Sequence, residues 1–209
     1  MNKDLLIKET CTKGMRITLG DNWRESLNKC IDIVTNLGFQ EIRLPIIQEY
    51  SIFEGKVGEE NNNMMYRFKD RGGRDLCLAP EYSGVVMQLA NTTFKYTKNV
   101  LLFYVAECFR GENPQKGRFR QFTQFGVEIL NPKEDFDPNT LIELAIKLCK
   151  TIRPELEYQI NTDVTRGLDY YLGGKGFEIR TSDNFQIVGG GAYPGGVGFA
   201  IGFDRLLSI

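Results

Sequence analysis

The 209-residue sequence contains no histidine at all. This absence excludes every mechanism that needs a protein imidazole, including histidine-based catalytic triads and most zinc hydrolases. Reactions that depend on charge clamps and on metal ions carried by the substrate, rather than on a general base, are still compatible with the composition.

Long apolar runs and paired cysteine motifs are missing as well. No run approaches the roughly 20 apolar residues that a membrane-spanning helix needs, and the apolar part of the N-terminal segment is too short for a signal peptide, so we expect a cytoplasmic protein. The five cysteines are scattered without a Cys-x-x-Cys pair, which indicates reduced thiols rather than a disulfide framework or a zinc site. The net charge of −1 offers no general positive field for nucleic acid. With no internal repeat, the length suits one domain over residues 1–209.

The most informative stretch predicts a charged hairpin. Apolar residues before it and an alternating pattern after it predict two strands, and the glycines and proline between them predict the loop. At even spacing along the second strand, Arg118, Arg120, Gln124 and Glu128 would share one face. Arginine forks of this kind suit bidentate recognition of phosphate or carboxylate. A solvated charged hairpin is the alternative, but an anion-binding site explains the spacing more economically.

This stretch, CFRGENPQKGRFRQFTQFGVEIL, resembles motif 2 of class II aminoacyl-tRNA synthetases in the version typical of histidyl-tRNA synthetases. By this resemblance Arg110 would bind the α-phosphate of ATP, Glu112 the adenine side, and Arg118 a phosphate or the substrate carboxylate. Gln124 and Glu128 would line the amino-acid pocket.

A second block, Arg-Gly-Leu-Asp-Tyr-Tyr at residues 166–171, resembles a signature specific to histidyl-tRNA synthetases. Arg166 would stabilise the charge of the α-phosphate in the transition state, as a catalytic residue together with Arg110. Tyr171 would offer an aromatic wall and a hydroxyl to an imidazole ring. The alternative is a pair of core tyrosines beside a surface arginine.

Two further blocks resemble the amino-acid site of the family, with departures. In Ala-Pro-Glu-Tyr-Ser at 79–83, Glu81 matches the glutamate that binds the α-ammonium group and Ser83 keeps a hydroxyl, whereas Ala79 and Tyr82 replace arginine and glycine. Tyr82 is therefore expected to narrow or reshape the pocket, which puts histidine itself in doubt as the substrate. We expect a helix to begin at Pro80, before the apolar run.

The second of these blocks is the stretch 188–198, which carries six glycines that would let the backbone approach a ligand closely; a flexible loop is the alternative. Tyr193 matches the family's GGRYDGL pattern and would line the amino-acid pocket. Ala192 and Pro194 stand where that pattern has arginine and aspartate.

Motifs 1 and 3 complete the resemblance. A helix expected over 21–36 leads into residues 38–60, GFQEIRLPIIQEYSIFEGKVGEE, which resemble motif 1. This segment contains a strand expected over 39–44, and the resemblance places Pro45 at a dimer interface; an ordinary amphipathic helix feeding an edge strand is the alternative. GVGFAIGFDRLLSI resembles motif 3, in which Arg205 would bind the γ-phosphate. The short interval between motif 2 and Arg166 leads us to expect no insertion domain, and the end at Ile209 no anticodon-binding domain.

The resemblance implies an α+β fold of the class II synthetase type, an antiparallel sheet flanked by helices, in a homodimer. It also implies an enzyme that activates histidine with ATP and Mg²⁺, like a histidine–tRNA ligase, with any tRNA contact confined to the acceptor end through Gln115 and Lys116. Catalysis ranks first because motif 2 and the 166–171 block are so complete.

The alternative function is that of a non-catalytic paralogue, the regulatory subunit of ATP phosphoribosyltransferase, bound to the catalytic subunit of that enzyme. The altered glycine-rich block, the expected absence of the tRNA-contacting domains and the lack of histidine favour it. A third hypothesis is transfer of the activated amino acid to an acceptor other than tRNA.

Overall fold

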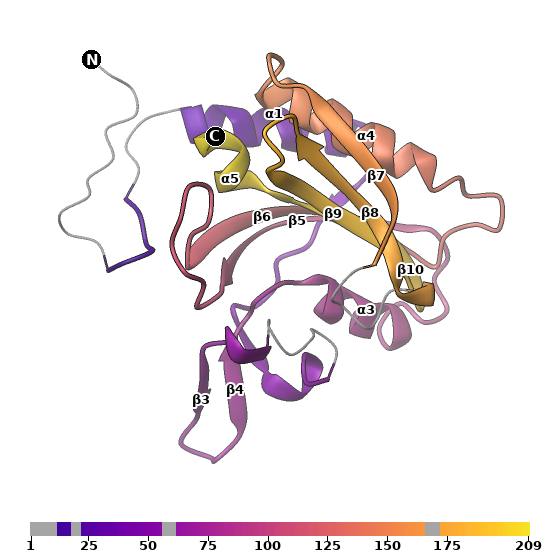
Figure 1. The fold of residues 1–209 in the computed structure, drawn as a ribbon. Helices are drawn as coiled ribbons and strands as arrows, with labels where there is room; N and C mark the ends of the chain where they lie inside the picture. The colour runs from indigo at the N-terminus through magenta and orange to yellow at the C-terminus, as the bar shows by residue number, and fades with distance from the viewer. Residues whose placement is uncertain (1–11, 18–21, 56–61, 166–171) are drawn as a thin grey trace.

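The computed structural model describes residues 12–17, 22–55, 62–165 and 172–209 (Figure 1). Its centre is a seven-stranded sheet whose strands are β1 (Gln40–Glu41), β5 (Val100–Phe109), β6 (Gln121–Leu130), β7 (Tyr158–Thr165), β8 (Lys175–Thr181), β9 (Gln186–Tyr193) and β10 (Gly196–Gly202). They are ordered β1-β5-β6-β10-β9-β8-β7, and only the pairing of β1 with β5 is parallel. The antiparallel sheet flanked by helices that the sequence predicts is thus confirmed.

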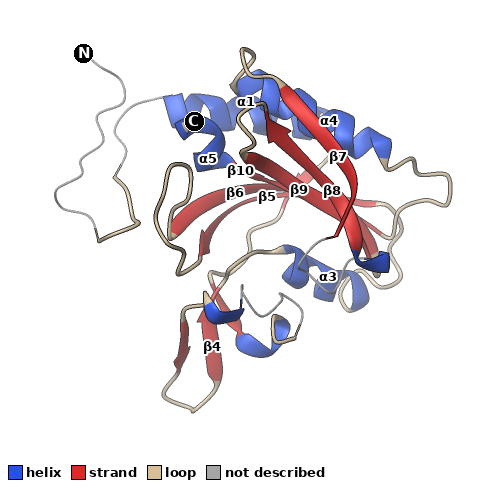
Figure 2. Ribbon diagram, in the orientation of Figure 1, coloured by secondary structure: helices blue, strands red, loops and turns tan. Residues whose placement is uncertain are grey.

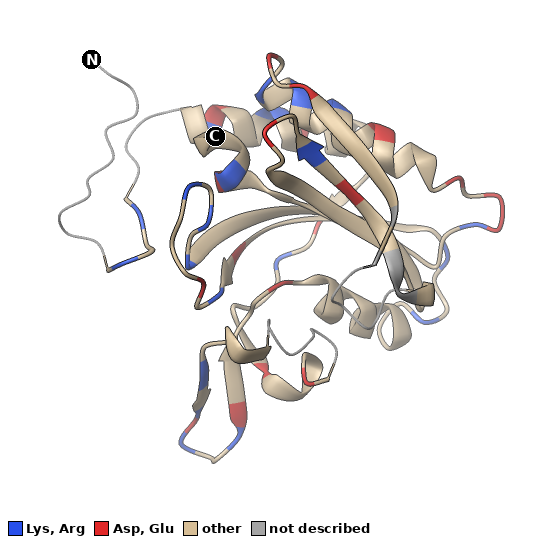
Figure 3. Ribbon diagram, viewed as in Figure 1, with Lys and Arg blue, Asp and Glu red and all other residues tan. Residues whose placement is uncertain are grey.

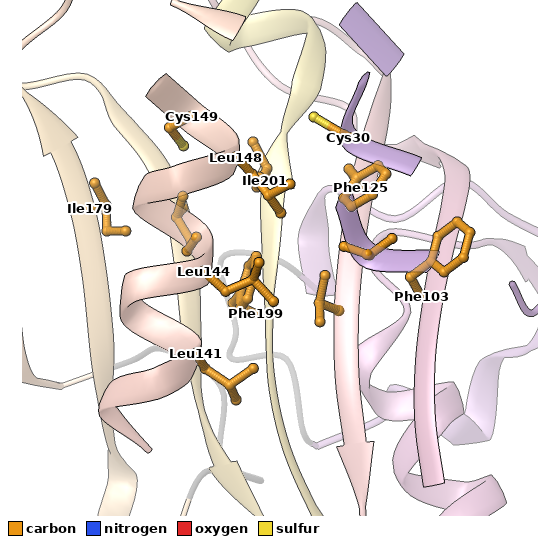
Figure 4. Close-up of a cluster of buried hydrophobic side chains, with 14 of the residues drawn as sticks. Cys30, Phe103, Phe125, Leu141, Leu144, Leu148, Cys149, Ile179, Phe199 and Ile201 are labelled. Atoms are coloured by element: carbon orange, nitrogen blue, oxygen red, sulfur yellow. The ribbon is translucent and has the colours of Figure 1, made fainter. Parts of the chain in front are cut away.

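Two helices, α1 (Asn22–Asn36) and α4 (Asn139–Ile152), cover one face of this sheet (Figures 1 and 2). In α4 the buried residues recur at helical spacing, which directs one apolar stripe at the sheet: Leu141, Leu144, Ala145, Leu148 and Cys149. Figure 4 shows Leu144, Leu148, Phe199 and Ile201 in this core, with Phe103 and Phe125 stacked 5.8 Å apart between ring centroids. Burial of this apolar area is the main contribution that holds the helices on the sheet.

The boundaries of these helices follow from local chemistry. After α1, Gly38 takes a φ of +90°, and the N–H of Phe39 donates to the carbonyl oxygen of Val34 at 3.0 Å, a helix end that favours glycine. At the start of α4 the carboxylate of Asp137 accepts the N–H of Asn139 at 3.0 Å. Residue 21, where the sequence places the start of the first helix, lies outside the described residues.

The opposite face of the sheet carries α3 (Ser83–Asn91) and a three-stranded sheet of β2 (Ile47–Glu49), β4 (Asp75–Leu78) and β3 (Arg67–Lys69), with the short 3-10 helix η1 (Tyr50–Ile52) beside β2 (Figure 2). A second apolar cluster, which includes Tyr82, Tyr104 and Leu102, fills the space between them. β3 and β4 form an antiparallel hairpin that turns at residues 70–74. Because side chains alternate along β6, its even-numbered residues face this second cluster and its odd-numbered residues face the helices.

Three expectations about the elements differ from the structure. The helix after Pro80 begins only at Ser83, because Ala79 and Pro80 still bond to the end of β5 through their carbonyl oxygens, which accept Phe109 N–H at 2.9 Å and Arg110 Nε at 2.8 Å. The strand expected over 39–44 pairs as a strand only at 40–41. Arg118 and Arg120 precede β6, so they do not share a strand face with Gln124.

The described cysteines are buried and form no disulfide with one another: Cys30, Cys77, Cys108 and Cys149. Burial raises the pKa of the Cys30 thiol to about 12, which keeps it protonated. Among the described residues no helix combines the length and the apolar character needed to cross a bilayer.

Candidate active site

A pocket opens on the α3 side of the large sheet, where β6, β9, β10 and the loop between β5 and β6 meet. Six of the residues predicted from the sequence are in its wall: Glu81, Ser83, Arg110, Glu112, Gln124 and Arg205. Segments that are far apart in the sequence therefore converge here, because β6 pairs with both β5 and β10.

Arg110 follows the last residue of β5 and is held in a defined orientation. Its Nε donates to the carbonyl oxygen of Pro80 at 2.8 Å, and its guanidinium carbon lies 5.3 Å from the centroid of the Phe122 ring. One hydrogen bond and one cation–π contact thus fix the plane of the group at the pocket wall.

Arg205 lies in the helix α5 (Phe203–Ser208) and is largely withdrawn from water. Its Nε donates to the carbonyl oxygen of Gly117 at 2.6 Å and its Nη1 to that of Gln186 at 2.7 Å. Burial lowers the pKa of Arg205; the Glu112 carboxylate opposes this shift, while Arg118 and Arg110 add to it. A buried guanidinium surrounded by more positive than negative charge would be stabilised by a bound anion.

Lys and Arg residues occur in the loop between β5 and β6 and in the nearby helix α5 (Figure 3). Arg118 belongs to this group, but it is half exposed and forms an ion pair with Glu112 at 3.4 Å. It is absent from the pocket wall, so it lies at the rim, within electrostatic reach of Arg205.

The other end of the pocket is acidic and polar. Glu81 is 5% exposed, and its carboxylate accepts the N–H of Gly84 in the first turn of α3 at 3.1 Å. Gln124 is in the pocket wall, and its buried Oε1 has no hydrogen-bond partner among the described residues. A buried acceptor without a partner is costly, and a donor group of a ligand would satisfy it.

Glu128 and Tyr193 lie beneath the wall rather than in it. Tyr193 Oη donates to one carboxylate oxygen of Glu128 at 2.7 Å, and Ser83 Oγ donates to the other at 3.3 Å. Glu128 is fully buried, and this burial raises its pKa to about 8; the nearby Glu81 adds to the shift, whereas both hydrogen bonds oppose it. These two residues therefore support Ser83, which is itself in the wall.

The glycine-rich stretch forms the paired strands β9 and β10 rather than a loop. At Gly198 a Cβ would stand 2.6 Å from the carbonyl oxygen of Val127 and closer still to the Glu128 carboxylate. Glycine at this position thus makes room for a side chain of the protein itself. Of the glycines in these two strands, Gly189 and Gly202 are in the pocket wall.

Tyr82 does not narrow the pocket. It is fully buried in the second apolar cluster, its Oη donates to the carbonyl oxygen of Glu107 at 3.1 Å, and its ring lies 5.5 Å from that of Tyr104. The expected effect on the amino-acid pocket is therefore absent, because the side chain points into the core.

Val188 and Gly189 of the wall belong to the glycine-rich stretch that the sequence predicts to approach a ligand. Further wall residues have no role predicted from the sequence: Phe119, Phe122, Gln186, Ile187, Ala200 and Gly202. Phe122 could have been found, since it is two residues before Gln124 on the same face of β6. The others come from β9, β10 and the loop, and only the strand pairing brings them together. Arg166 and Tyr171 lie outside the described residues.

Comparisons with known proteins identify the family of this chain. A family model described as histidyl-tRNA synthetase matches residues 21–152. The histidine–tRNA ligase of Methanosarcina acetivorans is 41% identical over 122 residues, which cover 58% of this chain and 30% of that protein. The ligase of Methanococcus maripaludis is 35% identical over 152 residues, which cover 71% of this chain and 36% of that protein. The match thus spans about a third of the length of these relatives.

A longer alignment reaches the ligase of Methanosphaerula palustris, at 29% identity, and covers 84% of this chain and 68% of that protein. Its 279 aligned positions exceed the 209 residues of this chain, so the relative carries additional residues inside the matched region.

Two solved structures share the fold. A Bacillus halodurans protein described as an ATP phosphoribosyltransferase regulatory subunit/histidyl-tRNA synthetase superposes with a TM-score of 0.75 at 14% identity, covering 96% of this chain and 83% of its own. Apo histidyl-tRNA synthetase of S. aureus superposes with a TM-score of 0.72 at 24% identity, and the superposition covers 95% of this chain and 69% of that one.

Proposed function

Because the chain belongs to the histidyl-tRNA synthetase family, we propose that its pocket activates histidine with ATP, giving histidyl-adenylate and pyrophosphate. The observation that carries this proposal is the polarity of the pocket. Arg110 and the desolvated Arg205 stand in the same wall as Glu81 and the unsatisfied Oε1 of Gln124. A polyanion and a small ammonium compound would therefore find complementary charge side by side.

At the cationic end, Arg110 would bind the α-phosphate and Arg205 the γ-phosphate, with Arg118 reaching in from the rim. Glu112 would contact the adenine side. No group of three or more acidic or sulfur ligands occurs among the described residues, so we expect Mg²⁺ to enter bound to the triphosphate. The metal would share the phosphate charge with the arginines.

At the acidic end, Glu81 would hold the α-ammonium group of histidine, and Gln124 would accept a hydrogen bond from the substrate. Ser83 would contribute its hydroxyl to the amino-acid pocket. Its position is fixed by Glu128, which is itself hydrogen-bonded to Tyr193. This arrangement would place the substrate carboxylate towards the α-phosphate. The walls thus supply proximity and charge stabilisation, which need no protein imidazole.

In the reaction itself, a carboxylate oxygen of histidine attacks the α-phosphorus and forms the new P–O bond. The bond from that phosphorus to the bridging oxygen breaks, and pyrophosphate leaves with the electron pair. Arg166 would stabilise the charge that develops on the α-phosphate, and Tyr171 would contact the imidazole ring; both assignments derive from the family motif.

We further propose that the chain forms a single domain, since two apolar clusters pack on opposite faces of one sheet, and that two copies associate through the motif 1 region. Transfer of the activated histidine to the acceptor end of tRNA, with contacts through Gln115 and Lys116, is the step that the family favours. An acceptor other than tRNA is the alternative for this step.

The test is amino-acid-dependent ATP–pyrophosphate exchange, measured with each of the standard amino acids. We expect exchange with histidine alone, lost in an Arg166→Ala variant. No exchange with any amino acid, in a protein that still binds histidine or ATP, would contradict the proposal.

The charge of Glu81 offers a finer test. Glu81→Gln keeps the shape and the acceptor for Gly84 N–H but removes the charge opposite the ammonium group. We expect the KM for histidine in the exchange reaction to rise about 10- to 100-fold, the usual loss for a hydrogen bond between charged groups, with the KM for ATP changed less than about threefold. The exposed Glu143→Gln on α4 is the matched control. Equal increases in both KM values would assign Glu81 a general structural role.

The second candidate function is a regulatory subunit of ATP phosphoribosyltransferase. Alanine at positions 79 and 192, where the family pattern has arginine, removes two positive charges from the expected site, and Ala79 is fully buried. Retained binding of histidine without exchange, together with association with a catalytic subunit of that enzyme, would favour this function over catalysis.

A further inference from the structure

Residues 12–17, here called the N-terminal strap, lie against the loop of residues 110–120 that joins β5 to β6. The backbone N–H of Arg120 donates to the carbonyl oxygen of Gly14 at 2.7 Å, and Arg120 Nη1 donates to that of Lys13 at 3.2 Å. Gly14 has a φ of +85°, and a Cβ there would stand 2.8 Å from the Arg120 side chain and 2.9 Å from Pro114. The close approach of strap and loop therefore depends on this glycine.

Arg16 of the strap contacts both halves of the phosphate-binding machinery. Its guanidinium forms an ion pair with Asp204, and its guanidinium carbon lies 4.4 Å from the centroid of the Phe119 ring. Phe119 belongs to the loop, whereas Asp204 precedes Arg205 in α5. The Arg16 side chain is only 14% exposed, so these contacts are partly shielded from water.

Asp204 in turn ties α5 to the rest of the fold. One carboxylate oxygen accepts the backbone N–H of Thr123 in β6, and the other accepts Trp23 Nε1 from α1 at 3.2 Å, alongside Arg16. Arg205, the next residue, holds the loop directly through its bond to Gly117. Loop, strap and α5 thus form one connected set of contacts next to the pocket.

We propose that Arg16 is a positioning residue for the phosphate-binding arginines. It does not line the pocket; it acts by joining the loop, which begins at Arg110, to the helix that carries Arg205. Its catalytic consequence rests on the proposed adenylation, whereas the mechanical link can be measured without any reaction. Displacement of a charge clamp by about 1 Å can cost about 100-fold in rate, so the link matters for turnover more than for binding of histidine.

The experiment compares Arg16→Gln, Arg16→Lys and the control Arg24→Gln. Arg24 is also an arginine beside an aromatic ring, that of Trp23 at 5.3 Å, but it is exposed and outside the strap. For each protein we would measure hydrogen exchange of the backbone amides of residues 115–120 and the kinetics of histidine-dependent pyrophosphate exchange.

We expect Arg16→Gln to speed amide exchange in the loop at least tenfold and to lower kcat about 10- to 100-fold, with the KM for histidine within about twofold of wild type. Arg16→Lys should keep the slow amide exchange of the loop and most of the wild-type kcat, since an ammonium group can still pair with Asp204. Arg24→Gln should behave as wild type. Unchanged loop exchange in Arg16→Gln overturns the proposal, as does a lower melting temperature with kcat and KM both intact.

The two proposals can fail separately. If the wild-type protein catalyses no pyrophosphate exchange with any amino acid, the proposal of adenylation is wrong. The role of Arg16 is then decided by two other measurements on Arg16→Gln: the hydrogen exchange of the loop amides and the affinity for ATP.

Discussion

Arg110→Ala is expected to lower the kcat/KM of histidine-dependent ATP–pyrophosphate exchange by about 10³-fold, comparable to the loss of one preorganised group that stabilises transition-state charge. The expectation follows from the way Arg110 is held. Its bond to Pro80 and its stacking on Phe122 fix the guanidinium before any ligand arrives. A preorganised cation needs no rearrangement when charge develops on the phosphate, so its removal raises the free energy of the transition state.

Two further variants separate charge from geometry. Arg110→Lys keeps the charge but lacks the planar fork, and we expect an intermediate loss of about 10- to 100-fold. Arg71→Ala, in the exposed turn between β3 and β4, removes an arginine far from the pocket wall and should leave the rate within about twofold. If Arg110→Ala retains exchange within about threefold of wild type, the pocket described here is not where the nucleotide reacts.

Glu128→Gln is expected to change how the stability of the fold depends on pH. The carboxyl group has a pKa of about 8 in the folded protein against 4.5 for an ordinary glutamate, because it is buried. Between these values the folded state keeps the proton that the unfolded state releases. The free energy of unfolding therefore falls by up to about 1.4 kcal/mol per pH unit as the pH rises from about 4.5 to about 8, and this contribution then levels off.

Glutamine resembles the protonated carboxyl group but cannot ionise, so the variant should lose this slope. It should unfold with nearly the wild-type free energy near pH 4.5 and be more stable than wild type by a few kcal/mol at pH 8. Urea denaturation at several pH values would measure this, with the exposed Glu134→Gln as control. Parallel pH profiles for wild type and Glu128→Gln would show that Glu128 is ionised in the folded protein at neutral pH.

The sequence was most informative where function and local pattern coincide. The hairpin of β5 and β6, its loop, and the positions of Arg110, Glu112 and Gln124 at one pocket all followed from alternation, turn residues and motif 2. In such a hairpin the partners are neighbours in the chain, so the local pattern already determines the pairing.

The contacts that the sequence did not reveal are those between distant segments. The glycine-rich stretch is predicted to approach a ligand, and Gly189 does line the pocket, but Gly198 accommodates Glu128 on a neighbouring strand. Tyr82 is predicted to reshape the pocket, yet this residue, which immediately precedes α3, packs against Tyr104 in the core. The pairing of Arg16 with Asp204 joins the two ends of the described chain. Each outcome depends on tertiary packing, which local propensity does not encode.

The order of strands in the large sheet has a consequence for how the protein folds. The pocket is completed where β6 pairs with β10, with Leu130 opposite Gly196 and Gln124 opposite Gly202. The elements α4, β7, β8 and β9 lie between these two strands in the chain. A hairpin such as β5–β6 can form early, but the pairing of β6 with β10 needs a long loop to close first, which is entropically costly and slow. The proposed nucleotide site would therefore be absent from any partly folded state that lacks β10, and nucleotide binding would report the end of folding rather than its beginning.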